Sequence, residues 1–477
     1  MAEQPMLKFT KIERDMPEKR DAEIRREDFN EIYAEYATAK AAEQSSRCSQ
    51  CGVPYCQTHC PLHNNIPDWL RLTAEGRLRE AYEVSQATNT FPEICGRICP
   101  QDRLCEGNCV IEQSGHGTVT IGSVEKYITD TAWENGWIQP IKPVAERAES
   151  VGIIGAGPGG LAAADVLRRA GVQVTIYDRY DRAGGLLTYG IPGFKLEKDV
   201  VMRRNEQLEL GGVKFELNCN VDADIFSSIQ AEHDAVIIAT GVYKSRDLSM
   251  PNGEVAGIEK AIDFLTASNR KSFGDEVVDF DSGRLNAQGK RVVVIGGGDT
   301  AMDCVRTSIR QGATSVKCLY RRDKANMPGS QREVQNAEEE GVIFEWLSAP
   351  KGFTTDGDKV AGVMVQKMRL GAPDATGRQA PEVIEGADYV EEADLVIKAL
   401  GFEPEVLPTL WDQPELEVTR WGTIKAAFTT GKTQMDGVYA VGDIVRGASL
   451  VVWAIRDGRD CADAILQDFG TAAIAAE

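Results

Sequence analysis

The spacing of hydrophobic and polar positions changes near residue 150. Before it, apolar residues recur at helical intervals, and the segment from Pro17 to Ser46 carries four of them at i, i+3, i+4 and i+7: Phe29, Ile32, Tyr33 and Tyr36. This pattern predicts an amphipathic helix that leads into a group of cysteines. Further helices are expected over residues 65–89 and around residues 120–133. Residues 1–145 are therefore predicted to form an α-helical domain, followed by a short exit linker.

After residue 150 the chain alternates short β-branched strands with glycine turns and helices, which predicts an α/β fold. One unit occurs twice, as "SVGIIGAGPGGLAAADVLRRAG" and as "KRVVVIGGGDTAMDCVRTSIRQG". The strand in "GVYAVGDI" resembles neither and is expected to return to the first unit. We thus expect two Rossmann-like dinucleotide-binding domains, one inserted into the other. The predicted ranges are 146–289 and 406–477 for the outer domain and 290–405 for the inserted domain.

Composition limits the partners. The chain has 477 residues, a length that fits about three domains. Its formal net charge of -20 repels nucleic acid and anionic membranes. No apolar run approaches the roughly 20 residues of a membrane span, and "MAEQPMLKFTKIERD" lacks the apolar core of a signal peptide. We expect a cytoplasmic protein that binds neither nucleic acid nor membrane.

The first glycine loop matches the dinucleotide fingerprint GxGxxG at Gly155, Gly157 and Gly160. These glycines would permit a tight turn, the approach of a pyrophosphate and close packing of helix on strand. Asp178 ends the next strand, "VTIYDR", where an acid binds a ribose hydroxyl and disfavours a 2'-phosphate. The expected ligand is FAD or NAD; the alternative is that Asp178 is only a surface acid at a strand end.

The second loop has Gly296, Gly297 and Gly298 followed by Asp299 and Thr300. The next strand, "SVKCLYRR", ends in Arg321 and Arg322 at the position where an acid would read a free ribose. Guanidinium groups match the charge and geometry of a phosphate, so the pair favours NADPH over NADH. A solvated basic turn is the alternative.

Eight of the twelve cysteines fall in two groups near the N-terminus: Cys48, Cys51, Cys56 and Cys60, then Cys95, Cys99, Cys105 and Cys109. Three close cysteines followed by a fourth before proline are typical of cubane iron–sulfur clusters. A structural zinc site and disulfides remain alternatives, although zinc sites usually pair two ligands from each of two knuckles. The other four cysteines are expected to be small buried hydrophobic residues.

The order "GAGPGG", "GGLLTYGIP", "AVIIATG" and "GVYAVGDI" resembles the two-dinucleotide flavoprotein reductases, in which the first site holds FAD. The resemblance extends the FAD site to Ala156, Pro158, Gly159, Gly184, Gly185, Leu186, Gly190, Thr240, Gly241, Gly442 and Asp443. It places Gly401, in "IKALGFEPE", near the pyridine nucleotide. For Asp443 a helix N-cap is the alternative role. Because the cofactors carry hydride transfer, no catalytic acid or base is nominated.

The N-terminal module, "RREDFNEIYAEYATAKAAEQSSRCSQCGVPYCQTHCPLHNNIPDWL" with "PEICGRICPQDRLCEGNC", resembles the small subunits of NADPH-dependent glutamate synthases. Relatives include the N-terminal part of dihydropyrimidine dehydrogenase and flavin subunits of NADP-ferredoxin transhydrogenases. The resemblance implies FAD, NADPH, two 4Fe-4S clusters and a hetero-oligomer with a large (alpha) subunit. The implied function is electron input for the synthesis of L-glutamate from L-glutamine and 2-oxoglutarate. The alternative is a flavin subunit of an NADPH-ferredoxin or pyrimidine-reducing oxidoreductase.

The resemblance to dihydropyrimidine dehydrogenase also implies how the ligands are shared. One cluster would take Cys48, Cys51, Cys56 and Cys109, and the other would take Cys60, Cys99 and Cys105. The relative's last ligand is a glutamine, and the matching position in this chain is Glu125. We expect Glu125 to complete the second cluster, with Cys95 as its competitor.

Overall fold

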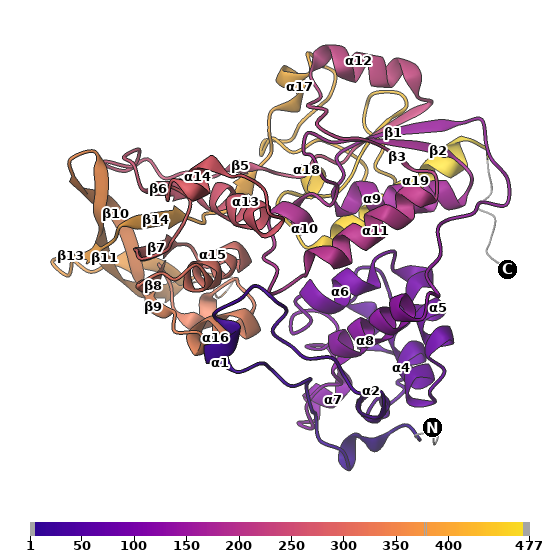
Figure 1. Ribbon diagram of the computed structural model, residues 1–477, viewed down its shortest axis with the longest axis horizontal. Helices are drawn as coiled ribbons and strands as arrows, with labels where there is room; N and C mark the ends of the chain where they lie inside the picture. Colours follow the sequence, from indigo (N-terminus) through magenta and orange to yellow (C-terminus); the bar gives the residue numbers. More distant parts are fainter. Residues whose placement is uncertain (1–4, 376, 378, 471–477) are drawn as a thin grey trace.

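The computed structural model describes residues 5–375, 377 and 379–470, which form one helical part and two α/β parts (Figure 1). The helices of the first part are α2 (Thr38–Ser45), α3 (Tyr55–Thr58), α4 (Ile66–Ala74), α5 (Leu78–Thr88), α6 (Pro92–Ile98), α7 (Val110–Gln113) and α8 (Ile121–Glu134). Trp69, Leu70, Val124 and Ile128 are almost fully buried in its core. The helices predicted over residues 65–89 and 120–133 are confirmed.

The predicted amphipathic helix from Pro17 to Ser46 is wrong. Only α1 (Ala22–Arg25) precedes α2, and residues 17–37 form an otherwise mostly non-helical segment, here called the N-terminal strap. Arg25 in the strap is 1% exposed and bonds Glu339 at 2.7 Å and Glu340 at 2.9 Å, at the end of α16 (Gln331–Glu339). Figure 1 shows α1 lying against α16. Tertiary contacts with a remote part of the chain thus override the local helical pattern.

The first α/β part contains a parallel sheet in the order β16-β4-β1-β2-β3. Its strands are β1 (Ser150–Ile154), β2 (Gln173–Tyr177), β3 (Lys214–Glu216), β4 (Ala235–Ile238) and β16 (Val438–Ala440). Its helices are α9 (Pro158–Arg169), α10 (Leu186–Tyr189), α11 (Lys198–Leu210), α12 (Ala223–Glu232), α17 (Leu407–Leu410), α18 (Asp443–Arg446) and α19 (Val451–Asp468). Because β16 pairs with β4, the strand of "GVYAVGDI" does return to the first unit.

The second α/β part contains a parallel sheet in the order β6-β14-β7-β8-β9. Its strands are β6 (Ile258–Lys260), β7 (Arg291–Ile295), β8 (Ser315–Tyr320), β9 (Ile343–Trp346) and β14 (Leu395–Lys398). Helices α13 (Ala261–Ser272), α14 (Val278–Asp281), α15 (Asp299–Arg310) and α16 accompany it. Strands β10 (Ser348–Asp356), β11 (Lys359–Pro373), β12 (Gln379–Val383) and β13 (Tyr389–Glu392) form an antiparallel extension.

A two-stranded ribbon marks where the chain passes between the α/β parts. Strand β5 (Lys244–Ser245) pairs antiparallel with β15 (Phe402–Glu403), so the outgoing and returning segments lie side by side. The second part is therefore inserted into the first. Strand β6 and helix α13 belong to the second part, although both precede residue 290, the predicted start of the inserted domain. The glycine motif marks the first strand–turn–helix unit of the insertion, whereas β6 carries no motif.

Among the helices of the described ranges, none has both the length and the apolar character needed to cross a membrane.

Candidate functional site

The carboxyl ends of β1, β4 and β16 open into a cavity of about 400 Å³, here called the first cavity. Most residues predicted for the first site line it: Gly155, Gly157, Pro158, Gly159, Asp178, Leu186, Thr240, Gly241, Gly442 and Asp443. The carboxyl end of a parallel sheet is where ligands bind in doubly wound folds. The hydroxyl of Thr240, a residue of the cavity lining, is buried and has no hydrogen-bond partner among the described residues.

Glycines of the first loop serve different purposes. Gly155 has a φ of +113°, and a Cβ there would lie 2.4 Å from the carbonyl oxygen of Ala239. At Gly160 a Cβ would lie 2.1 Å from the carbonyl oxygen of Gly155. At Gly157 a Cβ would meet nothing within 4 Å, and φ is −81°. Packing therefore requires Gly155 and Gly160, whereas Gly157 leaves open space before the N-terminus of α9, as an approaching pyrophosphate needs.

The remaining first-site residues do not line the cavity, and several of them pack against its glycine loop. The Gly184 amide donates to the carbonyl oxygen of Ala156 at 2.8 Å. A Cβ at Gly185 would lie 2.9 Å from the Cα of Gly157, and one at Gly190 would lie 3.0 Å from Leu186. None of Ala156, Gly160, Gly184, Gly185 and Gly190 is among the residues that line the first cavity.

Two of the acids that line the first cavity, Asp178 and Asp443, were predicted as site residues. Asp178 is 7% exposed and accepts bonds from the amides of Ala156 at 2.6 Å and Tyr180 at 2.9 Å. Burial raises its pKa although these amides oppose the shift. Asp443 accepts from the hydroxyl of Ser449 at 2.7 Å, while Gly442 is the N-cap of α18. Asp178 is thus not a surface acid, and Asp443 is not a helix N-cap.

The sequence interpretation missed an aromatic and charged wall of the first cavity. Arg179 forms two bonds to Glu405, at 3.0 and 3.1 Å, and its guanidinium lies 4.8 Å from the ring centre of Tyr243. The Tyr180 ring lies near that of Tyr243. Cys219, expected to be a buried hydrophobic residue, lines this cavity instead. The signal was weak, since only Arg179 directly follows a predicted site residue, Asp178.

The second glycine loop repeats the geometry of the first. A Cβ at Gly296 would lie 2.2 Å from the carbonyl oxygen of Ala399, and one at Gly297 would lie 2.4 Å from the ring of Tyr320. At Gly298 a Cβ would meet nothing within 4 Å, with φ at −89°. Gly298 is therefore the counterpart of Gly157, and it precedes α15 as Gly157 precedes α9.

Asp299 and Thr300 line a larger cavity of about 550 Å³, here called the central cavity, where all three parts of the molecule meet. Arg321 and Arg322 follow the end of β8, with Arg321 exposed and Arg322 partly buried. Gly401 lies between β14 and β15 with a φ of +89°. Neither Gly401 nor the two arginines are among the lining residues of either large cavity.

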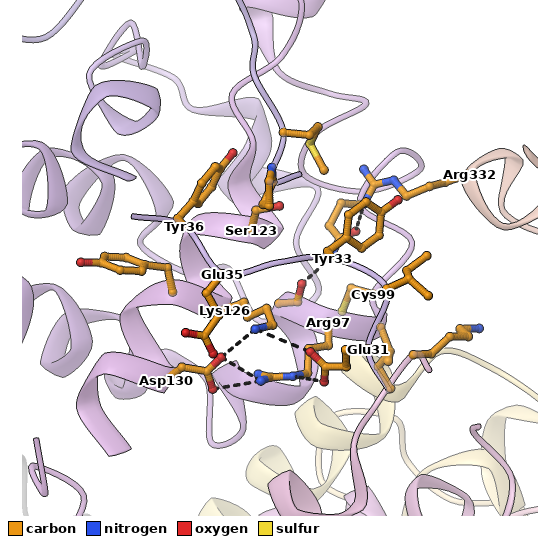
Figure 2. A pocket seen from close by; sticks show the side chains of 18 of the residues that line it. Glu31, Tyr33, Glu35, Tyr36, Arg97, Cys99, Ser123, Lys126, Asp130 and Arg332 are labelled. Atoms are coloured by element: carbon orange, nitrogen blue, oxygen red, sulfur yellow. Dashed lines mark hydrogen bonds and ion pairs between the residues drawn. The ribbon is translucent and has the colours of Figure 1, made fainter. Parts of the chain in front are cut away.

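Charged side chains cross-link the walls of the central cavity (Figure 2). Arg97 bonds Glu31 of the strap at 2.6 Å and Asp130 of α8 at 2.8 Å. Burial alone would raise the pKa of Asp130, but Arg97 and Lys126 lower it to about 2. On another wall, burial raises the pKa of Asp303 to about 6 although Lys195, at 2.9 Å, opposes the shift. Apart from Asp299 and Thr300 of the second glycine loop, no motif in the sequence indicated this cavity.

The cysteines surround two small cavities. The first cysteine cavity is lined by Cys48, Cys51, Cys56 and Cys109, and the second by Cys60, Cys95, Cys99, Cys105 and Glu125. The structure thus brings together both predicted sets and adds Cys95 to the second. Among the described residues, no three His, Cys, Asp or Glu side chains converge on the position of a single metal ion.

Glu125 is buried at the second cysteine cavity. Its Oε1 accepts from the amide groups of Asn64 at 2.9 Å and Asn89 at 3.2 Å. Burial raises its pKa to about 8, against the effect of these two amides. Cys95 is also buried, with its sulfur 3.8 Å from Oδ1 of Asn89. Both candidates for the last ligand therefore lie at the same cavity.

Comparisons with known proteins match each part of the chain. The family described as dihydropyrimidine dehydrogenase domain II, 4Fe-4S cluster, matches residues 25–137, and the family described as pyridine nucleotide-disulphide oxidoreductase matches residues 149–458. The solved structure of Mycobacterium tuberculosis FprA in complex with NADPH aligns with a TM-score of 0.57 and 20% identity, over 68% of this chain and 85% of that chain. That likeness establishes the fold of the α/β parts.

Full-length relatives are more similar. The glutamate synthase [NADPH] small chain of Azospirillum brasilense is 65% identical over 466 residues, which cover 98% of this chain and 96% of that protein. The protein of the same name from Escherichia coli K12 is 46% identical, over 97% and 98% of the two chains.

The fold and the sites define a pyridine-nucleotide-dependent oxidoreductase with an N-terminal iron–sulfur domain. Because the similarity runs through the whole chain, its family can be stated more narrowly. The chain belongs to the small chains of NADPH-dependent glutamate synthase.

Proposed function

We propose that this chain takes electrons from NADPH and delivers them to a large subunit that makes L-glutamate from L-glutamine and 2-oxoglutarate. One observation carries the proposal. The first and central cavities share Ile191 and the segment 449–451, and the next residue, Val452, lines the second cysteine cavity. A single short stretch of chain thus borders three candidate cofactor sites, as short-range electron transfer requires.

We assign FAD to the first cavity. Gly157 leaves space for the pyrophosphate, Thr240 lines the same cavity, and Asp178 offers a carboxylate for the ribose. Asp443, held by Ser449, lies where the ribityl-phosphate region would bind.

We assign NADPH to the second glycine loop, with its nicotinamide directed into the central cavity. Gly298 supplies the open approach to α15, whose N-terminus has no side-chain cap and favours a phosphate. Arg321 and Arg322 stand beyond the second strand of the unit, where the 2'-phosphate would lie.

We assign two 4Fe-4S clusters to the cysteine cavities. Cluster 1 would be held by Cys48, Cys51, Cys56 and Cys109, and cluster 2 by Cys60, Cys99, Cys105 and Glu125. When bound, these cofactors supply hydride acceptance at the flavin and single-electron transfer at the clusters. The chain itself binds and spaces them: segment 449–452 separates the flavin site from cluster 2, and Ile121 lines both cysteine cavities.

Iron and sulfide analysis of the anaerobically purified chain tests the cluster assignment. Two clusters require about eight irons and eight sulfides per chain, with visible absorption that bleaches on adding NADPH. Cys56→Ser should lose about half of the iron yet still reduce a dye directly from FAD. Four-coordinate zinc without a cluster absorption band would defeat the electron-transfer proposal, and loss of FAD in Cys56→Ser would mean that the cysteines are chiefly structural.

The last ligand of cluster 2 can be decided by paired variants. Glu125→Ala should lose iron from cluster 2, whereas Cys95→Ser should retain it if Glu125 is the ligand. The reverse result would assign the ligand to Cys95.

We further propose that the protein works in the cytoplasm, where its many cysteines would stay reduced.

A further inference from the structure

Arg47 is a fully buried cation immediately before Cys48. Its side chain is 0% exposed. The guanidinium donates to four backbone carbonyls: Ile12 at 3.0 Å, Thr118 at 2.5 Å, His116 at 2.7 Å and Gly117 at 2.8 Å. Two separate segments of chain therefore converge on this one side chain.

These partners satisfy the hydrogen bonds of Arg47 without neutralising its charge. Arg25, Arg306 and Arg310, which are also buried, all bond the carboxylate of Glu340. In contrast, none of the ion pairs among the described residues includes Arg47, whose acceptors are all carbonyls. A net positive charge is thus held in the interior, where electrostatic effects are much stronger than in water.

This charge adjoins the first cysteine cavity. Cys48, the next residue, lines that cavity, as does Val119, which follows the acceptor Thr118. Burial and the nearby Arg14 lower the pKa of Arg47, whereas the carboxylate of Glu112 opposes that shift. At the second cysteine cavity the ionisable lining groups are cysteines and the carboxyl of Glu125, and no arginine, lysine or histidine is among the lining residues. Nearby Glu106 is 2% exposed and is paired with Arg14 and Arg332.

We propose that Arg47 raises the reduction potential of cluster 1 relative to cluster 2 and so biases electrons toward the cluster 1 end of the chain. The inference rests on the proposed function. Each reduction of a cluster adds one negative charge, which a buried cation stabilises. The two electrons of one NADPH hydride leave the flavin in two single-electron transfers, and Arg47 neither gains nor loses an electron in either. Arg47 thus acts through cluster 1: it sets the reduction potential of that cluster and takes no part in the electron transfer itself.

The test compares Arg47→Gln, Arg47→Lys and a control, Arg79→Gln, in the full-length anaerobic protein. Arg79 lies on α5 of the same domain, with a side chain that is 69% exposed. Iron content and spectroscopic redox titration of each cluster are measured. Arg47→Gln should keep its iron but lower the potential of cluster 1 by at least the 59 mV that corresponds to a tenfold change for one electron. Arg47→Lys should stay near the wild type, and Arg79→Gln should not differ from it.

Other outcomes are equally decisive. Loss of cluster 1 in Arg47→Gln with retention in Arg47→Lys would still support a requirement for the charge. An unchanged potential in Arg47→Gln, or loss of cluster 1 in both variants, would overturn the inference and leave Arg47 a structural link. If the wild-type chain holds no cluster at the Cys48 site, the proposed function itself fails, which its iron content reveals before any variant is made.

Discussion

At the scale of single residues, adding one methyl group to a glycine loop should impair ligand binding at one nucleotide site and leave the other site intact. Gly157 and Gly298 each have open space where a Cβ would project and a φ that alanine tolerates. We expect Gly298→Ala to fold and keep its FAD but raise the KM for NADPH at least about tenfold, because the methyl group occupies the phosphate approach. Gly157→Ala should instead lose FAD. Flavin absorbance after desalting and dye-reduction kinetics measure both effects.

The two variants are each other's control, since they make the same change in equivalent loops. Full FAD content in Gly157→Ala together with an unchanged KM in Gly298→Ala would contradict both assignments.

Arg321 and Arg322 should decide the choice between the two pyridine nucleotides. Replacing both with Gln removes two charge-assisted bonds worth about 1.5–3 kcal/mol each, so kcat/KM for NADPH should fall by about 10²- to 10⁴-fold. NADH has no 2'-phosphate and should be affected little. Lys324→Gln is the matched control, because Lys324 is a neighbouring cation already paired with Glu338 at 2.8 Å. Equal losses with both nucleotides would count against a phosphate-binding role.

At the scale of secondary-structure elements, Glu340 joins the strap, α15 and the end of α16. It is fully buried and bonds Arg25, Arg306 and Arg310. Burial alone would raise its pKa, but the guanidinium groups lower it from 4.5 to about 2. The folded carboxyl is therefore ionised where the unfolded one would begin to protonate. Its contribution to stability is present above about pH 4.5 and is lost as the pH falls toward 2.

Glu340→Gln should accordingly destabilise the protein by about 3–5 kcal/mol at pH 7, because it leaves buried guanidinium groups without their counter-charge. Thermal and urea unfolding at pH 7 and at pH 3 measure this cost, and the difference from the wild type should shrink at the lower pH. Glu338→Gln, which breaks an exposed pair with Lys324, should cost at most about 1 kcal/mol. Equal costs for the two variants would show that the buried cluster has no special role.

The same elements show what sequence patterns can predict. Helices α4, α5 and α8 and both glycine units were predictable because their patterns are local: apolar spacing for the helices and steric demands for the glycines. The strap was not, because the partners of Arg25 lie more than 300 residues away in sequence. The wall of the first cavity was missed for a similar reason, since Glu405 meets Arg179 only after the chain returns from the insertion.

At the scale of the whole molecule, side chains lock the three parts together around the central cavity. Phe194, from the first α/β part, lies 4.4 Å from the guanidinium of Arg306 and 4.0 Å from that of Arg310 on α15. Arg332 of α16 bonds Gln101 and Glu106 in the cysteine-rich part. The second α/β part thus contacts both the first α/β part and the segment that runs from Gln101 to Glu106. This arrangement keeps the candidate cofactor sites within one assembled body.

The proposed electron path through the described residues includes no site at which we expect glutamate to form. The isolated chain should therefore oxidise NADPH with a dye as acceptor and make no glutamate from L-glutamine and 2-oxoglutarate. Mixing it with the large subunit should produce glutamate at the expense of NADPH, and size-exclusion chromatography should show the complex. Cys56→Ser should retain dye reduction but lose glutamate formation, because electrons are proposed to move toward cluster 1 on their way to the large subunit. Glutamate production by the isolated chain, or undiminished production by Cys56→Ser in the complex, would contradict this division of labour.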